Sequence, residues 1–279
     1  MRSRQLLRRT GRGVSRLVFV LALSVAACGG STTAVSHHSL KGLVLTEVVG
    51  GDYVPGGYAF LEQLPQVAVF ADGHIFSVPA SSSNFTSDPA LLSIVERDVP
   101  VGMLNRIVND AVAAGVTSHP PDLGRPPITD LATTTFTLTA DGHTWMQSAY
   151  ALGSSEGLTS DQLAARRRLE AFSTVLARLS RDLGGGSAAH PYKPASLSVF
   201  AVPATVPIAR SATVEQWPLE ILRGLPPGQS ECVAVVGRTN VARVVALAAR
   251  ATTQTIWANA RRRWQLVFRP DLPGAAPCA

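Results

Sequence analysis

The sequence predicts an α+β fold: antiparallel β-hairpins with about three helices packed on the sheet or sheets, in two lobes. Three observations favour this class. Asp-Gly turns separate β-prone runs, segments with helical apolar periodicity lie between the hairpins, and strands follow one another in adjacent pairs. A doubly wound parallel sheet would instead alternate single strands with helices. The 279 residues are 46% hydrophobic and 16% charged, which is typical of a globular chain.

Two tight hairpins give the clearest local signals. Their turns are Asp72-Gly73 and Asp141-Gly142. Glycine, and to a lesser degree aspartate, accepts the positive φ angles of such turns. Both turns read Ala-Asp-Gly-His, which indicates either a duplicated unit or one common turn used twice; little else matches, so we favour the second. The predicted strands are residues 67–70 and 75–78 in the first hairpin, and 134–139 and 144–150 in the second.

Apolar periodicity predicts three helices. The first covers residues 99–114, with Gly115 as its C-terminal cap. The second follows a capping box that begins at Thr159, and the third covers residues 240–250. The second helix has apolar residues at alternating spacings of four and three: Ala165, Leu169, Phe172, Leu176, Leu179 and Leu183.

The remaining β-prone runs complete the predicted organisation. They are residues 43–49, 91–96, 197–202, 232–236, 253–257 and 264–268. A stretch rich in glycine and proline, residues 184–194, is the best internal boundary. It separates an N-terminal α+β lobe of residues 40–183 from a C-terminal βαββ lobe of residues 195–279.

The N-terminus has the organisation of a secretory signal peptide. A basic region is followed by an apolar run of 11 residues, 17–27. Eleven helical residues span roughly 16 Å, about half of a hydrocarbon core of ~30 Å, so the run is too short for a transmembrane helix. We therefore expect residues 1–27 to be removed.

The segment Val25-Ala26-Ala27-Cys28 resembles the lipobox of bacterial lipoproteins. In that motif small residues precede a cysteine whose sulfur receives a diacylglycerol before the signal is cut off. The resemblance implies lipid attachment at Cys28. The small polar composition of residues 29–39 predicts a flexible tether over residues 28–39. Two or more acyl chains give stable anchoring. The expected location is the cell membrane, with the chain lipid-anchored on the extracytoplasmic face.

The charge of the whole chain is misleading. The formal net charge is +6, but six of the 25 basic residues lie within the first 16 positions, and no acidic residue precedes Cys28. The chain after residue 27 therefore has 19 basic and 19 acidic residues. A neutral body argues against nucleic acid as a partner.

Two further cysteines remain after Cys28. An exported chain reaches an oxidising compartment, where Cys232 and Cys278 are expected to form a structural disulfide. The alternative is a redox or metal-binding pair. No Cys-x-x-Cys motif and no histidine at ligand spacing supports that alternative.

Three other patterns are candidate sites. Residues 153–157 match the Gly-x-Ser-x-Gly nucleophile motif around Ser155, but two residues separate the match from the helix, so a plain loop is favoured. The pairs Asp72 with His74 and Asp141 with His143 would ligate a metal only if the hairpin tips met. We favour the interpretation that both pairs lie in solvent-exposed turns. The sequence therefore assigns no catalytic, metal-binding or cofactor-binding residue.

Two basic runs, residues 166–168 and 261–263, complete the candidates. The first is interpreted as mostly a solvated helix face and the second as a charged hairpin edge that discourages strand pairing. The alternative is contact with anionic headgroups or envelope polymers.

The chain resembles an uncharacterised family of secreted lipoproteins from high-G+C bacteria. The resemblance rests on the lipobox, the hairpin at residues 67–78, Trp217-Pro218-Leu219, and the segment 268–273 followed by Cys278. It implies location and no catalytic residues. The favoured function is a non-enzymatic envelope component that binds a small ligand or an envelope protein. An assembly factor and an anchored serine hydrolase are the alternatives.

Overall fold

The computed structural model describes residues 37–51, 60–61, 63–78, 89–181, 187–204, 213–220, 222, 230–259 and 261–278. The expected signal peptide, Cys28, most of the tether and the glycines at 184–186 lie outside the described residues. Val35–Ala279 forms one compact unit. Among the described residues, no helix has both the length and the apolar character needed to cross a membrane.

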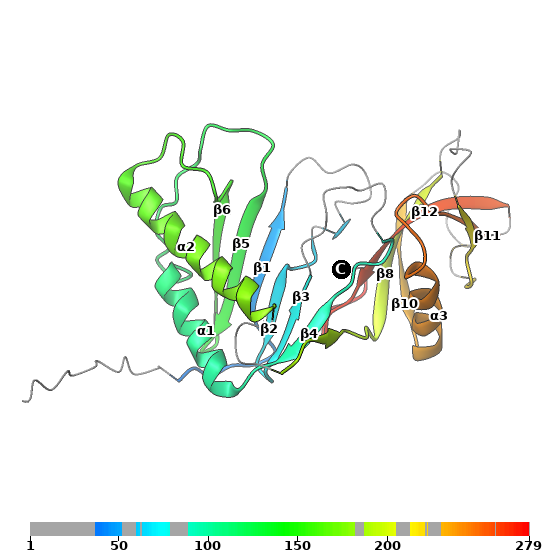
Figure 1. Cartoon of the computed structure of the whole chain (residues 1–279), viewed down its shortest axis with the longest axis horizontal. Helices are drawn as coiled ribbons and strands as arrows, with labels where there is room; N and C mark the ends of the chain where they lie inside the picture. Colours follow the sequence, from blue (N-terminus) through cyan, green and yellow to red (C-terminus); the bar gives the residue numbers. More distant parts are fainter. Residues whose placement is uncertain are drawn as a thin grey trace, which may run out of the picture. The chain divides into compact units, whose positions relative to one another are not determined.

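The fold is α+β, as the sequence predicts. The described residues form twelve strands in two sheets, with three helices (Figure 1). All pairings are antiparallel except that of the short strand β9 with β11.

The first sheet has seven strands in the order β6-β5-β1-β2-β3-β4-β7. Its strands are β1 Leu43–Gly50, β2 Val67–Phe70, β3 His74–Ser77, β4 Val95–Asp98, β5 Thr133–Ala140, β6 His143–Tyr150 and β7 His190–Pro191. β2 and β5 both run antiparallel to β1. Both Ala-Asp-Gly-His turns therefore lie at the end of the sheet where β1 begins.

The same tetrapeptide folds into two different turns. In the first hairpin the loop has three residues, 71–73, and only Gly73 has a positive φ (98°). In the second, Asp141 (53°) and Gly142 (76°) both have positive φ, and Ala140 pairs directly with His143. A β-carbon at Gly73 would lie 2.6 Å from the carbonyl oxygen of Val99, so glycine is required there for space as well as for conformation.

Helices α1 (Val101–Ala114) and α2 (Ser160–Leu179) pack on one face of this sheet. α1 ends at Gly115 in the left-handed conformation, as predicted. α2 begins with the predicted capping box, in which the side chains of Thr159 and Gln162 each bind the other's backbone N–H. The predicted apolar stripe of α2 is buried from Ala165 to Leu179, and its last predicted member, Leu183, lies outside the described residues.

The second sheet has five strands in the order β10-β8-β12-β11-β9. Its elements are β8 Ser196–Pro203, β9 Val214–Gln216, β10 Glu231–Val236, α3 Arg238–Ala248, β11 Ile256–Asn259 and β12 Arg262–Pro270. Its core contains Trp217, Trp257 and Phe268, whose rings contact one another. Aromatic residues in or beside these strands therefore form the core of this sheet.

Some boundaries differ from those predicted. The strand expected at 91–96 is β4, at Val95–Asp98, and the helix expected at 240–250 begins at Arg238, after Gly237 as its cap. The strands β7 and β9 were not predicted, because two or three residues at a sheet edge carry no recognisable period. β7 lies inside the segment proposed as an internal boundary and extends the first sheet.

The carboxyl group of Glu47 is buried between β1 and α2. The hydroxyl of Ser173 donates to its Oε1 at 2.5 Å. Burial raises the pKa of Glu47, and the Ser173 hydrogen bond lowers it by less. The pKa of the Glu47 carboxyl is therefore higher in the folded chain than in the unfolded chain. Such a group contributes its full stability to the fold at pH values below its unfolded-state pKa. The contribution is lost as the pH rises through the folded-state pKa.

We expect Glu47→Gln to stabilise the protein at pH 7 and to leave it nearly unchanged at pH 4. The amide removes the cost of burying a charge and still accepts from Ser173. Thermal unfolding at the two pH values should show a rise in Tm of about 3 °C at pH 7 only. An equal rise in Tm at pH 7 and at pH 4 would contradict a raised pKa for Glu47.

Candidate ligand-binding site

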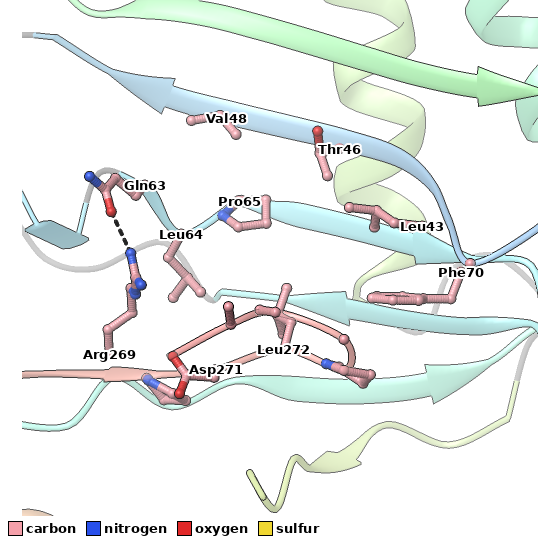
Figure 2. A pocket seen from close by; sticks show the side chains of 16 residues that line it. Leu43, Thr46, Val48, Gln63, Leu64, Pro65, Phe70, Arg269, Asp271 and Leu272 are labelled. Atoms are coloured by element: carbon pink, nitrogen blue, oxygen red, sulfur yellow. Dashed lines mark hydrogen bonds between the residues drawn. The ribbon is translucent and has the colours of Figure 1, made fainter. Parts of the chain in front are cut away.

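A pocket of about 760 Å³ lies beside the face of the seven-stranded sheet that the helices leave uncovered. We call it the tail pocket, because residues after β12 form one of its walls (Figure 2). It is lined by Gly42, Leu43, Thr46, Val48, Gln63, Leu64, Pro65, Phe70, Arg269, Pro270, Asp271, Leu272, Pro273, Gly274, Ala275 and Ala276.

The alternation of β1 places its side chains on the two faces. Leu45 belongs to the core beneath the helices, and Glu47 binds Ser173 of α2. Because successive side chains of a strand point to opposite faces, Thr46 and Val48 point away from the helices and into the tail pocket. Phe70 closes one end of the pocket, next to Leu43.

The opposite wall is the segment of residues 272–276, which we call the tail strap. It follows Asp271, whose carboxylate is buried and accepts two hydrogen bonds. The hydroxyl of Ser198 donates to Oδ1 at 2.6 Å, and that of Ser196 donates to Oδ2 at 2.7 Å. The Tyr192 hydroxyl donates to the Asp271 carbonyl oxygen at 2.9 Å. Burial raises the pKa of Tyr192 to about 12.

Arg269 and Gln63 form the polar end of the pocket. The guanidinium donates to Gln63 Oε1 and lies 4.3 Å from the centre of the Phe60 ring. Burial lowers the pKa of Arg269. Phe60 in turn stacks on Phe200 of β8, with the ring centres 5.6 Å apart. These contacts join the segment before β2 to the second sheet.

The lining is mostly apolar. Among the described lining residues, Arg269 and Asp271 are the charged ones, and both bind protein groups. Thr46 supplies the one hydroxyl side chain among these described residues. Most of the lining is aliphatic, aromatic or proline, which suits an elongated apolar ligand.

Ser155 is exposed in the loop before α2. His143 Nδ1 bonds the carbonyl of Asp141, and His190 Nδ1 lies 3.9 Å from Glu96. The loop interpretation of the Gly-x-Ser-x-Gly match accords with this placement.

The two histidine–aspartate pairs find separate partners. His74 Nδ1 lies 3.0 Å from Glu96 and 2.9 Å from Asp98 on β4. Asp141 is bound by the ring of His38 at 2.7 Å and by the backbone of Ser39. No group of three or more His, Cys, Asp or Glu residues in the described ranges is suited to hold a metal ion.

The expectation that residues 166–168 form a solvated face is wrong for Arg166. Arg167 and Arg168 are exposed, but Arg166 is only 1% exposed. Its guanidinium donates to four backbone carbonyls: those of Leu123, Tyr150, Ala151 and Leu152. The second basic run lies at the turn into β12, where Arg261 and Arg263 are exposed.

The expected disulfide is present. Cys232 of β10 is bonded to Cys278, with the Cα atoms 5.7 Å apart. It closes the end of the chain onto the edge strand of the five-stranded sheet. Cys28, the expected site of lipid attachment, lies outside the described residues.

The sequence did not identify the tail pocket. Its walls come from residues about 200 positions apart, and no local pattern in the sequence connects them. Comparisons with protein-family models, curated proteins and solved structures find no match to this chain.

Proposed function

We propose that this chain is a lipid-anchored component of the cell envelope that binds an elongated apolar ligand in the tail pocket. The anchor would be the lipidated Cys28, on the extracytoplasmic face of the membrane. The lipobox-like segment, the neutral charge of the chain after residue 27 and the disulfide support this location. The ligand is bound without covalent change.

The tail pocket is the observation that carries the binding proposal. Its polar end, at Arg269 and Gln63, lies opposite the apolar end at Phe70 (Figure 2). The pocket between these two ends is lined by Val48, Leu64 and the tail strap. An acyl chain lying along this space would have apolar contacts over its length. A polar head at one end would meet the amide and guanidinium groups.

Blocking the pocket is expected to abolish binding. The probe is cis-parinaric acid, a fatty acid whose fluorescence increases in apolar surroundings, titrated into the exported Cys28→Ser chain. Val48→Trp places an indole in the pocket and should weaken binding at least about tenfold, or about 1.4 kcal/mol.

Met146→Trp is the matched control. Met146 is 64% exposed on β6, on the same sheet face and outside the pocket lining. It adds the same ring to the same sheet and should leave the affinity unchanged. Equal weakening by both variants, or none by either, would contradict the assigned site.

The location is tested separately at Cys28. Replacing its sulfur with a hydroxyl, Cys28→Ser, removes the nucleophile that would accept the lipid. The unmodified chain should fractionate with membranes, and Cys28→Ser should be released into the soluble fraction. Mass spectrometry of the natural protein should show a diacylglycerol on Cys28 and no residues 1–27. A variant that stays with membranes would refute the anchor.

A further inference from the structure

The tail strap has few contacts of its own. Residues 273–276 are exposed, and Leu272 is half-buried against the cluster of Leu64, Phe70 and Phe76. Within the strap, the N–H of Ala275 donates to the carbonyl of Leu272 at 3.1 Å. A segment with so little burial is positioned mainly by its two ends.

The first end is the buried Asp271. Its carboxylate binds the hydroxyls of Ser196 and Ser198, and its N–H donates to the carbonyl of Ser196 at 3.1 Å. These contacts continue the pairing of β12 with β8 past Pro270.

The second end is Cys278. Its disulfide to Cys232 and the hydrogen bond from its N–H to the Ser198 Oγ at 2.8 Å hold it on the second sheet. Cys278 has a φ of 62°, which is unfavourable for a residue with a β-carbon. The disulfide therefore holds this end in a backbone conformation that a free chain would leave.

The disulfide lies at the edge of the second sheet. Cys232 and Cys278 are half-buried, and β10 is an edge strand. A soluble dithiol would approach the bond from this edge. Its thiolate would attack one sulfur to give a mixed disulfide, and its second thiol would release the protein.

We propose that the Cys232–Cys278 disulfide regulates ligand binding in the tail pocket, an inference that rests on the proposed function. The intact bond fixes the strap as a wall of the pocket. Reduction takes two electrons and two protons from a dithiol, which becomes a disulfide, and leaves two protein thiols. The strap then keeps its end at Asp271 but loses its covalent bond to β10, and the pocket loses a fixed wall.

The test compares cis-parinaric acid binding before and after reduction. The exported Cys28→Ser chain is used, which removes the remaining thiol. Reduction with a soluble dithiol should weaken binding at least tenfold, and reoxidation should restore it. The double variant Cys232→Ser/Cys278→Ser, in the same background, should bind like the reduced chain and should not respond to the dithiol.

Hydrogen exchange gives the second measurement. Residues 272–278 should exchange faster after reduction, whereas α1 and α2 should be unchanged. Equal affinity in both redox states would contradict this inference alone, and failure of the oxidised chain to bind would contradict the proposed function as well. Loss of the native tryptophan emission on reduction would show that the reduced chain unfolds. This result would also overturn the inference, because regulation requires that the reduced chain stays folded while its pocket lacks the fixed strap.

Discussion

Arg166→Ala should destabilise the protein by about 4 kcal/mol. The buried guanidinium donates to the carbonyl oxygens of residues 123, 150, 151 and 152. Removing it leaves buried acceptors without donors and opens a cavity. Denaturant unfolding followed by tryptophan emission measures the change.

The neighbouring Arg167 provides the control. It is exposed on the same helix turn, so Arg167→Ala should change the free energy of unfolding by less than about 0.5 kcal/mol. Arg166→Lys should recover only part of the loss, because an ammonium group lacks the planar fork that reaches several carbonyls together. Similar effects at positions 166 and 167 would refute the buried network.

Asp271→Ala should cost about 3 kcal/mol and weaken ligand binding as well. The substitution removes a buried carboxylate that accepts hydrogen bonds from Ser196 and Ser198, and hydrogen bonds to charged groups contribute about 1.5–3 kcal/mol each. It also frees the first end of the tail strap. Denaturant unfolding should show a lower free energy of unfolding, and cis-parinaric acid titration should show a weaker affinity.

Asp271→Asn is the conservative comparison. The amide oxygen can accept from one serine while the volume stays the same, so the variant should keep part of the stability and part of the affinity. A loss below about 1 kcal/mol in Asp271→Ala would show that the carboxylate does not hold the tail.

Local patterns predicted most of the fold. The capping box at Thr159, the cap at Gly115 and the turn at Asp141-Gly142 each follow from interactions within a few residues, and each is confirmed. The prediction for Arg166 is wrong because its carbonyl partners come from the end of β6 and from loops, which the helical period of α2 does not reveal.

The candidate site depends on longer-range order. Val48 and Leu272 line one pocket only because β1 and the chain after β12 meet in the folded protein. The disulfide could be expected from export and cysteine number, but nothing local showed that it ends a pocket wall. The lipid anchor, the two-lobe division and the cell-surface location stay predictions.

The most direct test of the proposed function is a crystal structure of the oxidised chain with a fatty acid brominated near its methyl end. The account predicts an anomalous bromine peak in the tail pocket, between Phe70 and the tail strap. It also predicts that the carboxylate end lies near Gln63 and Arg269. Bromine bound elsewhere, with the tail pocket empty, would contradict the proposed function.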